Sequence, residues 1–227
     1  MIPQPLDPTD TIRREIPRVA PNLVKAARPL STATLHEAAG KSGALPGAIK
    51  PTAAGFRLSG PAVTVHSPGG DNLWLHRAIY VAQPGDVLVV HTNLQFQHGY
   101  WGEIMATAAK VRGLAGLVID GCVRDGDLLT HIGFPVFARG LCIRGTGKDF
   151  GARGWINAPT LFEDVVVHPG DLIVGDGDGV VCIARDQVEQ VLQTARQREQ
   201  QEADILKRLE NGATTLDIYG WSRETGT

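Results

Sequence analysis

Several features that would place a protein in a particular class are absent from this sequence. No apolar run reaches the roughly 18 residues that a membrane span needs, and residues 1–17 lack the apolar core of a secretion signal. The formal net charge is only −2, without a basic stripe that could neutralise phosphates. We therefore expect a cytoplasmic protein that binds neither membrane nor nucleic acid.

Cysteine and the common catalytic signatures are equally sparse. The three cysteines stand at unrelated spacings without a CxxC pair, which predicts buried, reduced thiols and no zinc site. There is no GxSxG motif and no pair of histidines at helical spacing. The segment 145–149 (GTGKD) lacks the first glycine and the Ser or Thr that a nucleotide phosphate loop requires. A glycine-rich loop for a nucleoside cofactor is also missing, which argues against a methyltransferase.

The remaining pattern predicts one α/β domain. With 227 residues, 43% of them hydrophobic, the chain can bury one sizeable core. Residues 1–20 are rich in proline and charge and are expected to form an arm that is ordered only if it docks, so the domain itself spans 21–227. Apolar β-type runs alternate with helical runs in the first half, as in a layered α/β core. We expect strands at 62–67, 87–90, 117–119, 135–138, 162–167, 172–174 and 180–184.

Residues 185–210 are expected to form a long polar helix that ends at Asn211-Gly212. A helix with so narrow an apolar stripe usually packs that stripe on a neighbour, often another subunit. The segment Leu216–Trp221 that follows has enough apolar residues to dock as well.

The most informative stretch runs from Gly99 to Asp127. Gly99 and Gly102 predict a turn, and Glu103 follows at the start of a helix expected over 101–112. A buried strand then leads into Asp120, Gly121 and the pair Arg124-Asp125. A helix N-terminus that faces a strand C-terminus offers free N–H groups to an anion.

Three of these residues also allow a purely structural interpretation. Asp125 could bind a hard divalent cation and Arg124 a carboxylate or carbonyl oxygen, or the pair could be an exposed loop dipeptide. Glu103 could hold a metal-bound water or simply be favourable acidity in a first helical turn.

Two further groups of polar residues are expected to be structural. His36 and Glu37 follow the cap residue Ser31 in a helix and could act as acid and base, although such pairs are usually structural. Asp176 and Asp178 lie among glycines but lack the alternating ligands and closing Glu of a calcium loop, which predicts a turn.

Eight segments resemble the RraA-like family, and within it the class II pyruvate aldolases that cleave 4-hydroxy-4-methyl-2-oxoglutarate or 4-carboxy-4-hydroxy-2-oxoadipate. In chain order they are Thr34-Leu-His-Glu-Ala, Gly70-Asp-Asn-Leu-Trp-Leu-His, Pro84-Gly-Asp-Val-Leu-Val-Val, Gly99-Tyr-Trp-Gly-Glu, Ile119-Asp-Gly-Cys-Val-Arg-Asp, Asn157-Ala-Pro, Asp178-Gly-Val and Leu216-Asp-Ile-Tyr-Gly. The pairing of Gly-x-x-Gly-[Asp/Glu] with Asp-Gly-x-x-Arg-Asp is specific to the family but does not select one substrate.

The resemblance implies a layered β/β/α swivelling-type core, assembled as trimers or hexamers with active sites between subunits. It implies Asp125 as the direct Mg²⁺ or Mn²⁺ ligand, and Arg124 as the group that steadies a pyruvate enolate. Backbone amides from Gly102 through Glu103 and Ile104 to Met105 would hold the pyruvyl carboxylate. Glu103, together with Glu202 of a neighbouring subunit, would hold metal-bound waters.

Two departures from the family pattern bear on the substrate. Position 103 is Glu where Asp is expected, and the chain ends without the longer extension of many relatives. The sequence predicts a lyase that releases pyruvate, with oxaloacetate decarboxylation as a side activity. Arg77, His98 or Lys148 could bind extra carboxylates at the site mouth. The alternative is a non-enzymatic member of the family that binds and inhibits a ribonuclease.

Overall fold

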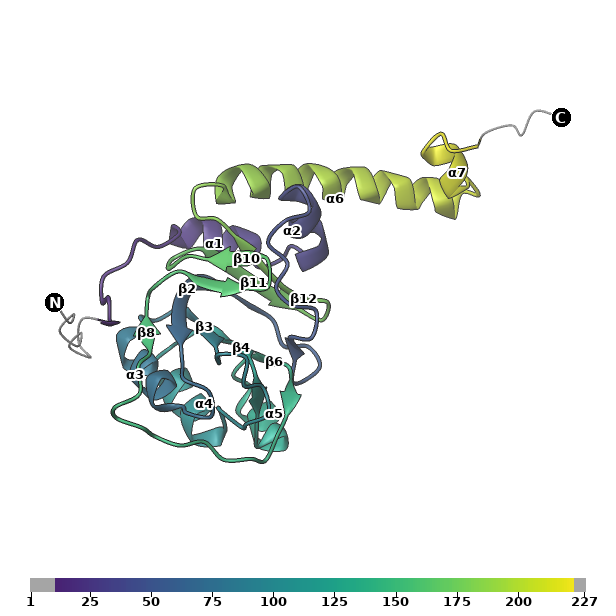
Figure 1. The fold of residues 1–227 in the computed structure, drawn as a ribbon. Coiled ribbons are helices and arrows are strands. Elements are labelled where there is room, and N and C mark those ends of the chain that lie inside the picture. The colour runs from purple at the N-terminus through teal and green to yellow at the C-terminus, as the bar shows by residue number, and fades with distance from the viewer. Residues whose placement is uncertain (1–10, 223–227) are drawn as a thin grey trace.

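The computed structural model describes residues 11–222 as a curved mixed sheet with helices on its outer faces and one long helix that extends away from them (Figure 1). The helices are α1 (Pro21–Ala27), α2 (Thr32–Ala38), α3 (Leu73–Val81), α4 (Glu103–Val111), α5 (Gly126–Ile132), α6 (Val188–Glu210) and α7 (Thr215–Ile218). The strands are β1 (Lys50–Pro51), β2 (Leu58–His66), β3 (Val87–His91), β4 (Gly116–Asp120), β5 (Cys122–Val123), β6 (Val136–Ala138), β7 (Gly140–Leu141), β8 (Trp155–Ile156), β9 (Thr160–Phe162), β10 (Val165–Val167), β11 (Leu172–Asp176) and β12 (Gly179–Ile183). None of the described helices is long and apolar enough to cross a membrane.

The main sheet has the order β1-β6-β4-β3-β2-β11-β12, with β8 beside the end of β2. Strands β2, β3, β4 and β6 are parallel, whereas β11, β12 and β1 pair antiparallel to their neighbours. The Lys50 ammonium at β1 donates to the Asp178 carbonyl in the β11–β12 turn, so the two edges of the sheet meet and nearly close it. Apolar side chains of β3 and β4 are buried on both faces, as the continuous hydrophobic runs predicted.

Three apolar clusters separate the layers. Helices α3, α4 and α5 cover the outer face of the parallel strands, with Leu75, Met105 and Leu129 in that cluster. A second cluster fills the inside of the curved sheet. The third lies between β11–β12 and the helices α1, α2 and α6. The single layered α/β core expected from the sequence is confirmed.

The described part of the N-terminal arm, residues 11–20, packs against the domain. Ile12 pairs with Ile156, and the Arg18 guanidinium makes two hydrogen bonds of 2.9 Å to the buried Asp86 carboxylate. Residues 1–10 of the predicted arm lie outside the described residues.

Helix α6 starts at Val188, three residues after the predicted start, and its first half is packed on the domain whereas its second half is exposed. Its buried residues, Val188, Val191, Leu192 and Ala195, lie in the first half and pack against α1 and α2. The second half and α7 project beyond the body (Figure 1), with Leu216, Tyr219 and Trp221 about half exposed or more.

One strand prediction was wrong. The run 162–167 is not one strand but the turn and flanks of a hairpin, because Glu163 takes a left-handed conformation (φ 53°) between β9 and β10. The predicted turn at 175–179 is confirmed in a tighter form, since β11 continues to Asp176 and β12 begins at Gly179.

Candidate active site

The centre of the candidate site is the close approach of Gly99–Gly102 to the loop after β5. The Arg124 amide donates to the Trp101 carbonyl at 2.8 Å, and the Tyr100 amide donates to the Cys122 carbonyl at 3.1 Å. The two glycines permit this approach. A Cβ on Gly99 would lie 2.4 Å from the Cys142 carbonyl oxygen, and one on Gly102 would lie 2.3 Å from Asp125 Oδ2.

Asp125 is aimed at the N-terminus of α4. Its backbone is left-handed (φ 62°, ψ 40°), an uncommon conformation that Asp adopts more readily than most residues and that often marks a functional site. Oδ2 accepts a 3.0 Å hydrogen bond from the Glu103 amide and lies 3.8 Å from Arg124 Nε. The Asp125 and Arg124 side chains are 35% and 48% exposed, so both reach solvent in the pocket.

The first turn of α4 offers free donors. The Ala106 amide bonds to the Gly102 carbonyl and the Glu103 amide to Asp125, whereas the Ile104 and Met105 amides have no hydrogen-bond partner among the described residues. A helix N-terminus with free N–H groups attracts a carboxylate. Of the four residues predicted to bind the substrate carboxylate through their amides, Gly102, Ile104 and Met105 have N–H groups without a partner among the described residues, and only the Glu103 amide is bonded.

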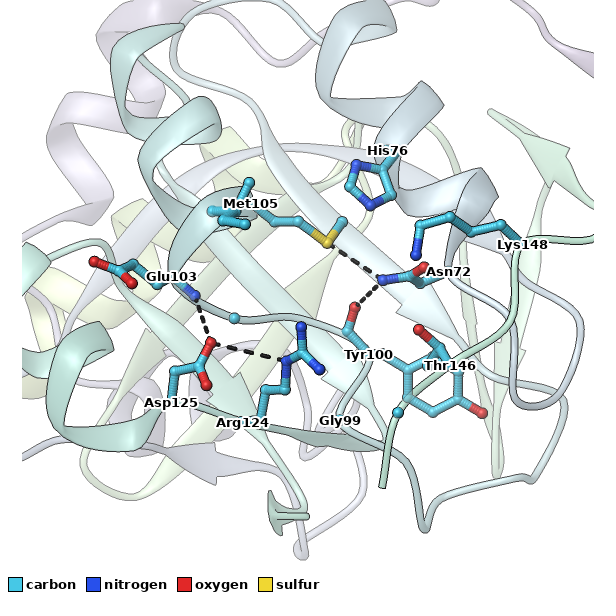
Figure 2. A pocket seen from close by; sticks show the side chains of 13 residues that line it. Asn72, His76, Gly99, Tyr100, Glu103, Met105, Arg124, Asp125, Thr146 and Lys148 are labelled. Carbon is cyan, nitrogen blue, oxygen red and sulfur yellow. Dashed lines mark hydrogen bonds and ion pairs between the residues drawn. The ribbon is translucent and has the colours of Figure 1, made fainter. Parts of the chain in front are cut away.

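The opposite wall of the pocket comes from segments distant in sequence, and Figure 2 shows His76, Asn72 and Lys148 gathered there. Asn72 Nδ2 donates to the Tyr100 carbonyl at 2.9 Å and points a second hydrogen at Met105 Sδ, 3.5 Å away. These bonds fix the amide orientation, and Asn72 Oδ1 is then a buried acceptor that no described residue satisfies.

His76 completes this wall of the pocket. Burial lowers its pKa first, and the nearby positive charge of Lys148 lowers it further, while Asp71 acts in the opposite direction. Burial and Lys148 thus both favour the neutral imidazole.

All of these groups line one pocket of about 300 Å³. Six of the predicted site residues lie in its wall, namely Gly102, Glu103, Ile104, Met105, Arg124 and Asp125. Glu202 does not; it lies on the projecting half of α6, 3.5 Å from Arg198. Its predicted role requires a second subunit, and the roles of all seven residues stay predictions.

The sequence analysis missed several lining residues. These are Asn72, His76, Tyr100, Gly145 and Thr146. Lys148, which was considered for the site mouth, does line the pocket, whereas Arg77 stacks on Trp74 outside it. A signal existed in the segment 145–149. Its glycine-rich, basic pattern does not form a nucleotide loop, but Gly145, Thr146 and Lys148 line this pocket.

Three acidic positions from the sequence analysis lie elsewhere and have structural partners. Asp120 turns to the inner side of the sheet and pairs with Arg139 at 2.5 Å. Asp176 caps α2 by accepting from the Thr32 amide at 2.8 Å and its hydroxyl at 2.6 Å. Glu37 lies 3.8 Å from Arg198, and its neighbour His36 contacts the Ser42 carbonyl. These contacts support the structural interpretation of the His36-Glu37 pair and of the Asp176 turn.

The donor set fits a divalent cation that keeps much of its water. No group of three or more His, Cys, Asp or Glu residues able to hold a metal occurs within residues 11–222. Asp125 Oδ1, however, has no hydrogen-bond partner in the described chain and belongs to a partly exposed carboxylate beside Glu103. Mg²⁺ is typically bound by one or two carboxylates, with water and substrate filling its shell, and Mn²⁺ accepts similar oxygen ligands.

The fold is a single α/β domain, and its pocket brings unbonded helix N-terminal amides beside Arg124 and Asp125. Residues 30–182 match the model of the RraA-like family, described as Aldolase/RraA, and the chain belongs to this family. A protein of Halalkalibacterium halodurans named "Putative 4-hydroxy-4-methyl-2-oxoglutarate aldolase" is 40% identical over 151 residues, which cover 66% of this chain and 71% of that protein.

Solved structures agree with this assignment. An uncharacterized protein from Pseudomonas syringae pv. tomato superposes with a TM-score of 0.77 at 30% identity, covering 88% of this chain and 93% of that one. Streptomyces coelicolor RraAS2, described as an unusual member of the RNase ES inhibitor RraA protein family, superposes with a TM-score of 0.73 at 26% identity. It covers 83% of this chain and 98% of the Streptomyces chain. The family thus includes proteins named for an aldolase and for a ribonuclease inhibitor.

Proposed function

We propose that this protein is a divalent-metal-dependent lyase that cleaves 4-hydroxy-2-oxo acids such as 4-hydroxy-4-methyl-2-oxoglutarate or 4-carboxy-4-hydroxy-2-oxoadipate and releases pyruvate. One observation carries the proposal. The Asp125 carboxylate, the Arg124 guanidinium and the free amides of α4 converge on one pocket. The left-handed backbone of Asp125 directs its carboxylate to the start of α4, and Gly102, which has no Cβ, leaves space for that carboxylate. Several relatives named as putative aldolases of this class support the chemistry.

Each group has a distinct task at the pyruvyl end of the substrate. The Ile104 and Met105 amides bind the C1 carboxylate, and Arg124 lies beside Asp125 to stabilise negative charge that develops on the C2 oxygen. Asp125 would hold Mg²⁺ or Mn²⁺ directly, with Glu103 and Glu202 of the partner subunit holding it through water. When bound, the cation supplies Lewis-acid polarisation of the ketone.

The reaction is a retro-aldol cleavage. A base removes the proton of the C4 hydroxyl, the C3–C4 bond breaks, and its electron pair forms the enolate of pyruvate while C4 becomes a carbonyl. Protonation of C3 then gives pyruvate. Oxaloacetate loses CO₂ to give the same enolate, so the groups that stabilise this enolate predict decarboxylation as a side activity.

Helix α6 supports an assembly as a trimer or hexamer. Its second half carries no buried residue and projects from the body with Leu206 and the apolar side chains around α7 exposed. Burial of these side chains against a second subunit would stabilise the assembly. The same contact would bring Glu202 to a neighbouring pocket.

The test is pyruvate release from 4-carboxy-4-hydroxy-2-oxoadipate, 4-hydroxy-4-methyl-2-oxoglutarate and oxaloacetate, with and without Mg²⁺ or Mn²⁺. Wild-type protein should release pyruvate only with the cation, and Asp125→Ala should lose at least a hundredfold in kcat/KM, as expected when a direct ligand is removed. Faster turnover of an aldol than of oxaloacetate would identify cleavage as the main reaction. The absence of pyruvate from all three substrates with either cation would refute the lyase.

The similarity to RraAS2 favours one second candidate, a regulator that binds and inhibits a ribonuclease. Its test is inhibition of a purified ribonuclease of the RNase E type, using wild-type protein and Asp125→Ala. A regulator needs no cation at Asp125, so equal inhibition by both proteins, together with no pyruvate release, would favour this candidate.

A further inference from the structure

Two histidines end neighbouring parallel strands on the inner face of the sheet. His66 is the last residue of β2 and His91 the last residue of β3, and the two lie in register. Side chains in register on neighbouring strands point to the same face, and His91 meets Phe162 of the inner apolar cluster. The rest of β3 is wholly apolar and β2 is largely so, which makes these imidazoles an exception. Ligands of α/β sheets commonly bind outside the carboxyl ends of the parallel strands.

A pocket of about 380 Å³ lies at these strand ends. Its lining consists of the two histidines, Trp155 from β8 and residues 158–161, and we call it the histidine pocket. It shares no lining residue with the pocket at Arg124 and Asp125, so the two cavities are separate. A cavity of this size, lined mainly by rings and aliphatic side chains, suits a small organic molecule.

The rings of the histidine pocket form a continuous aromatic wall. The imidazoles of His66 and His91 are stacked, with centroids 5.4 Å apart and an angle of 18° between their planes. The Trp155 ring meets His66 edge to face at a centroid distance of 4.8 Å and is 37% exposed. An aromatic ligand can extend such a wall by one more stacked or edge-to-face contact.

The same rings carry hydrogen-bond donors that are not in use. His91 Nδ1 accepts from the Asn93 amide at 3.2 Å, which places the proton of the neutral ring on Nε2. The ring nitrogens of His66 and Trp155 have no hydrogen-bond partner within residues 11–222. Asp120, next to His91 in the register, is already paired with Arg139 at 2.5 Å and leaves no unpaired negative charge in this row. Several N–H donors beside an aromatic wall suit a ligand with a carboxylate.

The geometry of the rings is less suitable for a metal ion. An imidazole binds a metal in the plane of its ring, and the in-plane lone pairs of two stacked rings run side by side without converging on one ion. His91 Nδ1 and the Asp120 carboxylate have partners of their own. The described part of the chain holds no group of three or more His, Cys, Asp or Glu residues that could bind a metal.

We propose that the histidine pocket is a second binding site and that it takes a small aromatic carboxylate. The ligand ring packs against Trp155 and Leu161, and its carboxylate accepts hydrogen bonds from His66 and His91. The assignment does not depend on the proposed lyase activity, because it uses none of the residues assigned to that reaction.

Three small probes separate the ring contact from the carboxylate contact. Benzoate has both groups, benzyl alcohol has only the ring, and acetate has only the carboxylate. Isothermal titration of the full chain should show benzoate binding at least about tenfold more tightly than either of the others. Trp155→Leu and His91→Leu should each weaken benzoate binding about tenfold, as expected for the loss of a ring contact or of a hydrogen bond to a charged group. The matched controls Trp221→Leu and His131→Leu, at exposed positions, should bind benzoate as wild type does.

Histidine ring signals in ¹H–¹³C NMR spectra show where benzoate binds in the wild-type protein. The signals of His66 and His91 should shift with benzoate concentration, while that of the exposed His131 stays in place. A shift of the His76 signal alone would place benzoate in the pocket at Arg124 and overturn the inference. Unchanged histidine signals at about 50 mM benzoate, far above the roughly millimolar Kd expected for a ligand of this size, would overturn it as well. Benzyl alcohol that binds as tightly as benzoate would refute the carboxylate contact, and wild-type affinity in both pocket variants would refute the site.

Discussion

Substitution of Gly102 by alanine tests the geometry of the site most directly. The residue has extended backbone angles (φ −156°, ψ −165°) that alanine adopts without strain, so only the new methyl group matters. This methyl carbon would lie 2.3 Å from Asp125 Oδ2 and 3.2 Å from Arg124 Cγ. Ordinary van der Waals contact begins near 3.4 Å, so Oδ2 must move by about 1 Å.

That movement has two separable consequences. The hydrogen bond from the Glu103 amide to Asp125 is lost, which costs about 1 kcal/mol because the carboxylate is partly exposed, and lowers Tm by about 2–4 °C. The same shift misplaces the proposed cation ligand, and a 1 Å error at a reacting centre costs roughly a hundredfold in rate. Gly102→Ala should therefore remain folded but lose about a hundredfold in kcat/KM and bind Mn²⁺ more weakly.

The assays are pyruvate release coupled to lactate dehydrogenase, Mn²⁺ titration followed by electron paramagnetic resonance, and thermal unfolding. Gly47→Ala is the matched control, since a Cβ there meets no atom within 4 Å and φ is not in the left-handed region. Gly102→Ala with wild-type activity and Mn²⁺ affinity would refute the assignment of Asp125 as the cation ligand.

Two further predictions concern stability. Arg18→Met removes the guanidinium that makes two hydrogen bonds to the buried Asp86 carboxylate, and should lower the free energy of unfolding by about 3 kcal/mol in urea titrations. The control Arg14→Met, at an exposed position, should change it by less than about 0.5 kcal/mol. Equal effects of the two variants would contradict a stabilising role of the Arg18–Asp86 pair. Burial lowers the pKa of both His66 and His91 below the unfolded value of 6.5, and their proximity lowers that of His66 further. As the pH falls, these histidines are therefore protonated in the unfolded chain at a higher pH than in the folded chain. The free energy of unfolding should then decrease as the pH drops below about 6.5. Urea unfolding at several pH values should show a smaller decrease in the double variant His66→Gln, His91→Gln than in wild type, and parallel curves would disprove the linkage.

Elements with a local signal could be predicted from the sequence. Ser31 caps α2 through a 3.0 Å bond from the Thr34 amide, and the apolar run at Val87 forms a buried strand, as expected. The hairpin at Glu163 could not be foreseen, because a non-glycine residue in left-handed conformation interrupts an otherwise uniform run of β-forming residues. The placement of β11 beside β2 also lacks a local signal, since it depends on the packing of distant segments.

The two ends of the pocket differ in the same way. The end of the pocket proposed to bind the pyruvyl group is built from one continuous stretch, Gly99 to Asp125, whose glycines and acidic residues are visible in sequence. The wall with Asn72, His76 and Lys148 exists only because β2, α3 and the 145–149 loop meet in the folded chain.

The two ends of the pocket are also held in place independently. The groups proposed to stabilise the enolate are fixed by contacts within 99–125, and Lys148 is fixed by Asp71 and Gly70, which belong to another part of the chain. A change in the 145–149 loop can therefore reshape this wall while the Arg124 and Asp125 geometry stays intact. Two bonds between the regions end on Tyr100, one from Asn72 Nδ2 to its carbonyl at 2.9 Å and one from the Gly70 amide to its hydroxyl at 2.8 Å. Tyr100 is therefore a residue through which a change at one end would reach the other.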